Sequence, residues 1–190
     1  DLLHPCQTYT DAFSMAEKWS NGGDLMEALK GKKIAYFGDT ANNIANSWIL
    51  GAALFQMELV LAGPPDYAPG DEIQELLHKS EHAPSYQFTS DPEEAACDAD
   101  VLYTDTWVSM GREEESAERI EVMKPYSVTE DLMELGKPDA LFMHDLPAYK
   151  GMEVQEEVLY GDQSIIFDQA ENRLHTQKAI MAVLAQGVKA

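Results

Sequence analysis

Short apolar runs alternate with amphipathic stretches along the chain, and this pattern predicts an α/β fold. The runs with the length of buried strands are Lys33–Phe37, Glu58–Ala62, Asp100–Thr104, Ala140–Met143 and Ser164–Phe167. The run Tyr86–Thr89 is a further candidate, either as another strand or as an extension of the sheet edge. Short apolar runs bounded by turn residues are typical of strands that are covered on both faces.

Apolar residues between these runs recur at helical spacing. The predicted helices are Asn43–Phe55, Asp71–Lys79, Pro92–Cys97, Glu115–Met123 and Thr129–Leu135, with two flanking helices at Thr8–Trp19 and Ala170–Gln186. The alternation of strands and helices predicts a Rossmann-like three-layer sandwich. It has a parallel sheet of roughly five strands and helices on both faces.

Polar residues follow four of the predicted strands, namely Asp39, Asp105, His144 and Asp168. Right-handed crossovers bring the carboxyl ends of parallel strands to one rim, where α/β sheets bind ligands, so we expect all four on that rim. Asp105 precedes a turn at 109–111 that lets main chain approach a small molecule, and its carboxylate suits an ammonium group. The simpler interpretation is that Asp105 only caps the next helix.

The composition indicates an acidic globular protein of 190 residues, with 45% hydrophobic residues for the core of one domain. A formal net charge of −21 argues against nucleic acid as a partner. It fits a solvated acidic surface better than attraction of a cationic substrate. No apolar run reaches the length of a membrane span. Cys6 and Cys97 lack metal-type spacing, and without a secretory signal they indicate the cytoplasm.

Five segments carry the candidate chemistry: His4–Gln7, Gly38–Ser47, Asp105–Gly111, His144–Pro147 and Asp168–His175. In this order they resemble the ornithine-binding half of the ornithine carbamoyltransferases, and the resemblance covers essentially the whole chain. It implies transfer of the carbamoyl group of carbamoyl phosphate to the δ-amine of L-ornithine. The products would be citrulline and phosphate, in arginine metabolism, without a metal or an organic cofactor.

The resemblance implies that His4, Gln7 and Arg173 are catalytic residues for carbamoyl phosphate. His4 and Gln7 would hydrogen-bond its carbonyl oxygen and amino group, and they lie three apart at a helix start, so both can face one ligand. Arg173 would offer a cation to the charge that develops on the carbamoyl oxygen. Asp168 and Gln169 are expected to cap and orient the turn beside Arg173.

For ornithine, the resemblance implies that Asn43 binds the α-carboxylate, with Asn42 as the second choice. Asp105 would bind the α-ammonium group, helped by Ser109 and by the backbone near Met110. The segment 38–43 lacks the glycine spacing of a dinucleotide fingerprint, so nicotinamide binding is not predicted.

Asp145 stands where the family pattern His-Cys-Leu-Pro has cysteine. The backbone carbonyls of Asp145 and Leu146 are expected to accept hydrogen bonds from the carbamoyl amino group and the δ-amine. The added carboxylate could bind the δ-ammonium or accept its proton, or it could keep the amine protonated and slow the reaction. Two alternative functions therefore stay open. The chain could belong to a related carbamoyltransferase with another amine substrate, or it could be a non-catalytic amino-acid-binding module.

The resemblance also implies a part that this chain lacks. In the family a Ser-Thr-Arg-Thr segment on an amino-terminal domain holds the phosphate, and no such segment occurs here. We therefore expect one ornithine-binding domain over 1–190. Its helical ends, 1–20 and 170–190, would pack on the missing carbamoyl-phosphate domain. The complete enzyme would be a homotrimer, and this chain alone would be nearly inactive.

Overall fold

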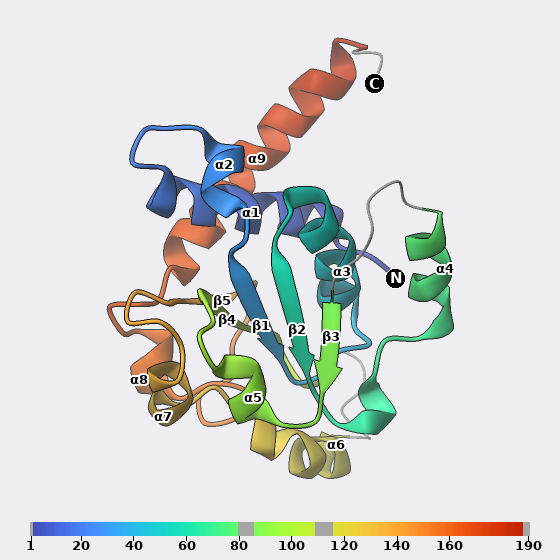
Figure 1. Cartoon of the computed structure of the whole chain (residues 1–190), viewed down its shortest axis with the longest axis vertical. Coiled ribbons are helices and arrows are strands. Elements are labelled where there is room, and N and C mark those ends of the chain that lie inside the picture. The colour runs from blue at the N-terminus through green and yellow to red at the C-terminus, as the bar shows by residue number, and fades with distance from the viewer. Residues whose placement is uncertain (1, 80–85, 109–115, 188–190) are drawn as a thin grey trace.

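Five parallel strands form one sheet between two layers of helices (Figure 1). The structure, a computed structural model, describes residues 2–79, 86–108 and 116–187. The strands are β1 (Lys33–Phe37), β2 (Glu58–Ala62), β3 (Tyr86–Thr89), β4 (Val101–Thr104) and β5 (Leu141–His144). Their order across the sheet is β3-β2-β1-β4-β5, and every neighbouring pair is parallel. The predicted fold class is confirmed.

The helices separate the strands along the chain as the sequence pattern predicts. They are α1 (Pro5–Ser20), α2 (Leu25–Leu29), α3 (Asn43–Phe55), α4 (Asp71–His78), α5 (Pro92–Ala96), α6 (Ser116–Met123), α7 (Glu130–Glu134), α8 (Glu156–Leu159) and α9 (Ile166–Ala185), with 3-10 turns η1 (Pro65–Tyr67) and η3 (Lys124–Tyr126). All predicted helices are present, with ends that differ by a few residues. The short α2 and α8 were not predicted, because so few turns show no helical period. None of the described helices is both long and apolar enough to cross a membrane.

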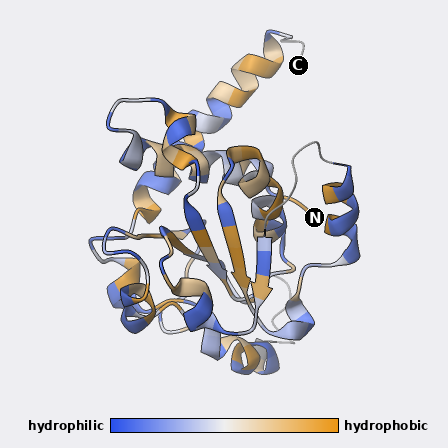
Figure 2. Cartoon of the chain, viewed as in Figure 1, coloured by the Kyte–Doolittle hydropathy of each residue, from blue (hydrophilic) through white to orange (hydrophobic). Residues whose placement is uncertain are grey.

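Side chains of β1, β2, β4 and β5 alternate between two hydrophobic cores. In β1, Ile34 and Tyr36 join the core beneath α1 and α3. Ala35 and Phe37 join the core on the opposite face, with residues of α5, α7 and α8. Successive side chains of a strand point to opposite faces, so a strand buried on both faces must be apolar throughout. Figure 2 shows β2 mainly in the hydrophobic colour, whereas α4 is largely hydrophilic.

The prediction of a strand at Ser164–Phe167 is wrong. The fifth strand of the sheet is instead β3. Ser164 forms only an isolated bridge with Phe142 of β5, and α9 begins two residues later. The buried residues of α9 are Ile166, Gln169 and Asn172, at helical spacing. The apolar run at 164–167 is therefore the start of a helix face that packs on the sheet.

From β1 the chain builds the sheet in one direction through β2 and β3, and then in the other direction through β4 and β5. The strand register brings the carboxyl ends of β1, β4 and β5 to the same level. Phe37 pairs with Thr104, and Thr104 pairs with His144. The next residue of β4 and the next residue of β5 are Asp105 and Asp145, which leave adjacent strands at the same level. Ligands of open α/β sheets bind at such a switch point.

Gly63, directly after β2, has no room for a side chain. A Cβ atom there would lie 2.4 Å from the carbonyl oxygen of Gly38 and 2.9 Å from Cγ2 of Thr40. We expect Gly63→Ala to lower the free energy of unfolding by about 1–3 kcal/mol, because backbone would have to shift. Urea denaturation measures this, with Gly70→Ala as the control, since a Cβ at Gly70 meets nothing within 4 Å. Equal losses in the two variants would contradict the prediction.

Candidate active site

Asp105 lies at the switch point and is held by the start of α3. Its Oδ2 accepts a hydrogen bond from Asn42 Nδ2 at 3.0 Å, and the same amide donates to the hydroxyl of Tyr36 at 2.8 Å. Asn42 is also the N-cap of α3, because its Oδ1 accepts from the backbone N–H of Ala45 at 2.8 Å. The cap thereby fixes the position of the Asp105 carboxylate.

Asp145 forms a carboxyl pair with Asp105. Burial and then the negative charge of Asp105 raise the pKa of Asp145 to about 9. Burial also raises the pKa of Asp105, although the nearby His144 imidazole and a hydrogen bond from Asp145 oppose that rise. Two carboxyl groups this close cannot both ionise easily. With a pKa of about 9, Asp145 therefore keeps its proton at neutral pH.

His144 is fully buried and is held at both ring nitrogens. Its Nδ1 accepts a hydrogen bond from the backbone N–H of Leu146 at 2.9 Å, and its Nε2 lies 3.3 Å from Oε1 of Glu153. The hydrogen-bond pattern assigns the ring proton to Nε2, which donates to Glu153. Leu146 has a φ of 59°, in the left-handed region that residues other than glycine adopt uncommonly.

Asp105, His144 and Asp145 are also a possible ligand set for a metal ion. Each offers one ligand atom, and these atoms lie within 4.8 Å of one another. A metal would have to displace the N–H of Leu146 from Nδ1 of His144 and the proton of the carboxyl pair, because metal ligands bind deprotonated. The prediction that no metal is needed stays a prediction.

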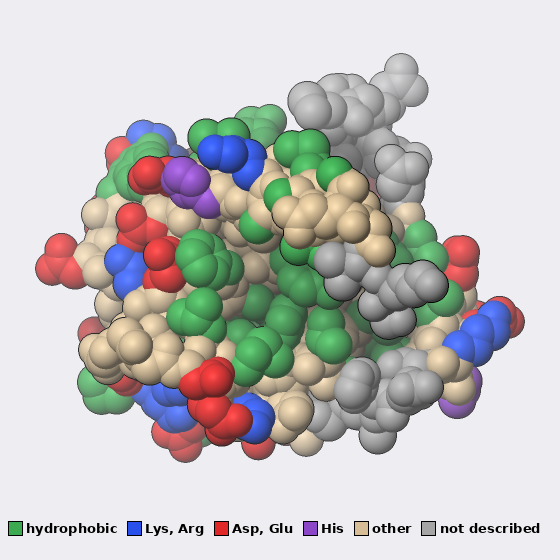
Figure 3. Space-filling model, turned by 90° about the horizontal axis from the view of Figure 1, so that it is seen from above, with side chains coloured by type: hydrophobic (Ala, Val, Ile, Leu, Met, Phe, Trp, Pro, Cys, Tyr) green, Lys and Arg blue, Asp and Glu red, His purple; other side chains and the backbone are tan. Residues whose placement is uncertain are grey.

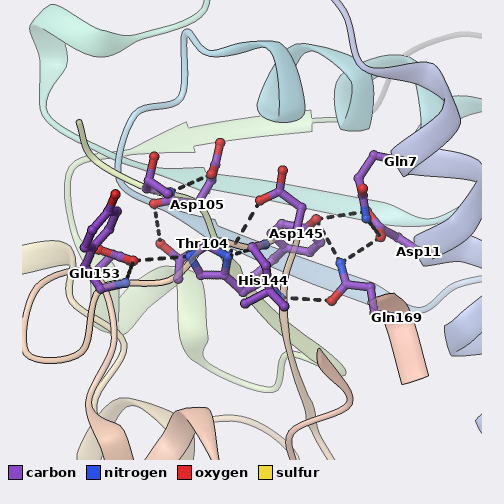
Figure 4. A network of polar contacts seen from close by, with 12 residues as sticks. Gln7, Asp11, Thr104, Asp105, His144, Asp145, Glu153 and Gln169 are labelled. Atoms are coloured by element: carbon purple, nitrogen blue, oxygen red, sulfur yellow. Dashed lines mark hydrogen bonds and ion pairs between the residues drawn. The ribbon is translucent and has the colours of Figure 1, made fainter. Parts of the chain in front are cut away.

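A buried hydrogen-bond chain connects this rim to α1 and α9 (Figure 4). Gln169 of α9 accepts from the backbone N–H of His144 at 3.1 Å and donates to Oδ1 of Asp11 at 2.7 Å. Oδ2 of Asp11 accepts from the hydroxyl of Tyr103 at 3.0 Å. Asp11 is fully buried, which raises its pKa to about 6 although these hydrogen bonds oppose the rise. Figure 4 shows His144 and Asp145 between Glu153 and this chain.

The chain continues to the residues predicted for carbamoyl phosphate. Gln7 donates to Oδ1 of Asp11 at 2.7 Å, and its Oε1 accepts from Nη1 of Arg173. Nε of Arg173 is buried and has no hydrogen-bond partner among the described residues. Burial and then the positive charge of Arg173 lower the pKa of His4, whereas Asp105 raises it. His4 therefore lies within electrostatic reach of both groups.

A sequence model for the Asp/Orn-binding domain of the aspartate/ornithine carbamoyltransferases matches residues 30–184. The chain belongs to this family. It is 48% identical over 187 residues to the ornithine carbamoyltransferase of Methanoculleus marisnigri, covering 98% of this chain and 57% of that protein.

Solved structures of ornithine carbamoyltransferases are similar to the chain throughout its length. That from Pyrococcus furiosus has a TM-score of 0.86 at 39% identity, covering 100% of this chain and 58% of the other. The anabolic enzyme from Campylobacter jejuni has a TM-score of 0.85 at 35% identity, covering 98% of this chain and 60% of the other. The chain thus spans somewhat more than half the length of these carbamoyltransferases.

Two of the predicted rim residues of this carbamoyltransferase domain are engaged elsewhere. Asp168 was wrongly placed on the rim, because it lies in the first turn of α9 and forms an ion pair with Lys18 of α1 at 2.5 Å. Asp39 does follow β1, but its carboxylate forms an ion pair with Arg119. Each of these carboxylates is thus paired with a cation of the chain itself.

Other predicted residues of the carbamoyltransferase site keep their roles as predictions. Ser109 and Met110 lie outside the described residues. The side chain of Asn43 makes no hydrogen bond to another described residue, whereas Asn42, the second choice, is occupied by Asp105 and Tyr36.

Asp11 and Glu153 were missed by the sequence interpretation, although both are fully buried beside the site. A signal for Asp11 existed, since it is an acidic residue on the face of α1 that also carries Gln7 and the buried Met15. It lies four residues after Gln7 and next to Ala12, which belongs to the core. Glu153 lies in a loop and offers no comparable pattern.

Proposed function

We propose that this chain is the L-ornithine-binding domain of an ornithine carbamoyltransferase. The observation that carries the proposal is the Asp105 carboxylate, held at the switch point by Asn42 with no lysine or arginine of the described residues paired to it. A partly buried carboxylate that is not paired with a lysine or arginine favours a cationic ligand. His4 and Arg173 lie close by, as a carbamoyl-transfer site requires.

Each charged group of ornithine has a matching residue in this arrangement. The α-ammonium would pair with Asp105, and the α-carboxylate would accept from the amide of Asn43, helped by Ser109 and the backbone near Met110. The backbone at Asp145 and the next residue, Leu146, would hold the δ-amine. Fixing both ends of the amino acid aims its δ-nitrogen in one direction, which is the main contribution that a transferase of this kind makes.

Carbamoyl phosphate would bind opposite the δ-amine, against His4 and Arg173. The nitrogen attacks the carbamoyl carbon, a nitrogen–carbon bond forms, and the carbon–oxygen bond to phosphate breaks, giving citrulline and phosphate. The Arg173 guanidinium would stabilise the negative charge on the carbamoyl oxygen. Gln7, whose amide is engaged by Asp11 and Arg173, would orient that guanidinium and face the carbamoyl amino group.

The part of the relatives that this chain does not cover would supply the phosphate site. The exposed apolar faces of α1 and α9 support this part of the proposal. Tyr9, Val183 and Leu184 are 45%, 52% and 74% exposed, and they line an apolar groove of about 400 Å³. Figure 3 shows apolar side chains gathered on this face, and α9 projects from it in Figure 1.

We propose that the helical ends 1–20 and 170–190 pack on a carbamoyl-phosphate domain. The complete enzyme would be a cytoplasmic homotrimer, and the isolated chain would be nearly inactive. The two cysteines, which are both free, fit a reducing compartment.

Calorimetric titration of the chain with L-ornithine, putrescine and N-acetylornithine tests the amino-acid site. We expect only ornithine to bind, because putrescine has no α-carboxylate and N-acetylornithine has no α-ammonium. Tighter binding of putrescine would indicate another amine substrate.

The activity is tested on a chimera in which the amino-terminal part of the Methanoculleus marisnigri relative precedes this chain. We expect the chimera, and not the chain alone, to form citrulline and phosphate. A folded chimera that carbamoylates none of the three amines would reject the proposed function.

A further inference from the structure

Asp11 is a fully buried carboxyl group to which three neighbouring side chains donate hydrogen bonds. Its Oδ1 accepts from the amides of Gln7 and Gln169, each at 2.7 Å. Its Oδ2 accepts from the hydroxyl of Tyr103 at 3.0 Å. Figure 4 shows both amides pointing at Asp11. These three donors are neutral, so hydrogen bonds rather than an ion pair offset the cost of burying this carboxylate.

The carboxylate of Asp11 determines which way both amides face. A carboxylate has no hydrogen to donate, so Gln7 and Gln169 must turn their NH₂ groups toward it and their oxygens away from it. The oxygen of Gln7 then accepts from Nη1 of Arg173. The oxygen of Gln169 accepts from the backbone N–H of His144 at 3.1 Å. A reversed Gln7 amide would present its NH₂ group to the guanidinium, and two groups that only donate would face each other.

The amide of Gln7 transmits the effect of the carboxylate to Arg173. Its positive NH₂ end faces Asp11 and its negative oxygen end faces the guanidinium, so its dipole lies between unlike charges in the favourable direction. Gln7 and Asp11 are one turn apart on α1, whereas Arg173 is on α9. A carboxylate on one helix thus sets the orientation of a guanidinium on the other.

Gln169 fixes the turn of α9 that carries Arg173. The two residues lie four apart and therefore on the same side of this helix. Through the amide of Gln169, this turn is bonded both to Asp11 of α1 and to the backbone of β5 at His144. Asp11 therefore acts on Arg173 by two routes, through the amide of Gln7 and through the placement of α9.

We propose that Asp11 is a positioning residue for carbamoyl phosphate, which holds Gln7 and α9 so that the Arg173 guanidinium points at the carbamoyl oxygen. This inference rests on the proposed function and deepens it. Asp11 touches neither substrate, and no bond to it forms or breaks in the reaction. Nε of Arg173 is buried without a partner among the described residues, so a guanidinium held in this way has a donor left for a ligand.

The test compares the chimera described above with its Asp11→Leu variant near pH 8, because burial raises the pKa of Asp11 only to about 6 and its carboxyl is then ionised. Leucine has the branched shape of aspartate but no acceptor atom, so Gln7 and Arg173 lose their fixed orientation. We expect kcat/KM for carbamoyl phosphate to fall by roughly 30-fold, since a misplacement of about 1 Å can cost about 100-fold in rate. The KM for ornithine should change by less than about twofold, because Asp105 and Asn43 do not depend on this contact.

A double-mutant cycle with Arg173→Lys separates a positioning role from a merely structural one. Lysine keeps a cation, but it lacks the planar fork that Gln7 orients. If Asp11 acts through the guanidinium, Asp11→Leu should cost only about threefold or less in the Arg173→Lys background. A merely structural role would lower kcat/KM by the same factor in both backgrounds.

Ser14→Ala is the matched control for the contact between the two helices. Ser14 is buried on α1, and its hydroxyl accepts from the amide of Asn172 of α9 at 3.1 Å. The variant therefore also loses a buried hydrogen bond between α1 and α9, but one that does not lead to Gln7. We expect its kcat and both KM values to stay within about twofold of the parent.

Asp11→Asn is the second variant, for the case that Asp11→Leu does not fold. Asparagine keeps one of the two acceptor oxygens and gains an NH₂ group that meets one of the three donors. We expect a smaller loss of kcat/KM for carbamoyl phosphate, roughly fivefold, which should again shrink in the Arg173→Lys background.

The outcomes separate this inference from the proposed function. If the parent chimera forms citrulline but the Asp11 variant keeps the parent's kcat/KM for carbamoyl phosphate, the inference is overturned and the proposed function stands. A loss by the same factor in both Arg173 backgrounds overturns it equally. If the folded parent carbamoylates no amine, the proposed function fails, and the inference fails with it.

Discussion

Asp105→Asn weakens the binding of L-ornithine by about 100-fold or more in calorimetric titration. Asparagine has the same shape as aspartate, and its carbonyl oxygen can still accept the hydrogen bond from Asn42. It lacks the negative charge that would pair with the α-ammonium group. Removing one partner of a buried charge pair costs about 2–5 kcal/mol, and each 1.4 kcal/mol corresponds to about a tenfold change in affinity.

The control for this prediction is the ligand rather than a second variant. N-acetylornithine has no α-ammonium, so the substitution should not change its titration, and it should bind neither the parent nor Asp105→Asn. The melting temperature of the variant should stay close to that of the parent, because the contact with the cap of α3 is kept. Unchanged affinity for ornithine would mean that its α-ammonium binds elsewhere.

Asp11→Asn changes how the stability of the chain depends on pH. Burial raises the pKa of Asp11 to about 6 in the folded state, against 3.8 for an ordinary aspartate. Below about pH 4 the carboxyl is protonated in both states, and its full contribution to stability is present. As the pH rises to about 6, the unfolded chain loses the proton first, so the contribution is lost. The difference between the two pKa values corresponds to about 3 kcal/mol.

Urea denaturation of the parent and of Asp11→Asn between pH 4 and 7 measures this contribution. At pH 4 the asparagine variant should be the less stable protein, since its NH₂ group faces the donors of Gln7 and Gln169. Towards pH 7 the difference should move by about 3 kcal/mol in favour of the variant. Comparing the two proteins cancels the titration of the many exposed acids, for which Asp66→Asn is the control. If the free energy of unfolding depended on pH in the same way for the parent and for Asp11→Asn, the prediction would be contradicted.

The elements with the strongest local pattern were predicted to the residue. β1, β2 and α3 have the predicted ends, because their apolar residues follow one period and turn residues bound them. The error at Ser164–Phe167 arose where a short apolar run suits a strand and the first turn of a helix equally well. Its packing against β5 and α1, and not its own sequence, decides between the two.

The sequence by itself determined the order of strands and helices, the fold class and the polar residues at the strand ends. Those properties depend on hydrophobic spacing and on turns within a few residues of one another. Only the tertiary structure decided that Asp105 and Asp145 form a pair, that Asn42 rather than Asn43 holds Asp105, and that Asp11 is buried against Tyr103 and Gln169. These contacts join residues that are far apart in the chain. They depend on strand register and on burial in a low dielectric, for which a local pattern carries no signal.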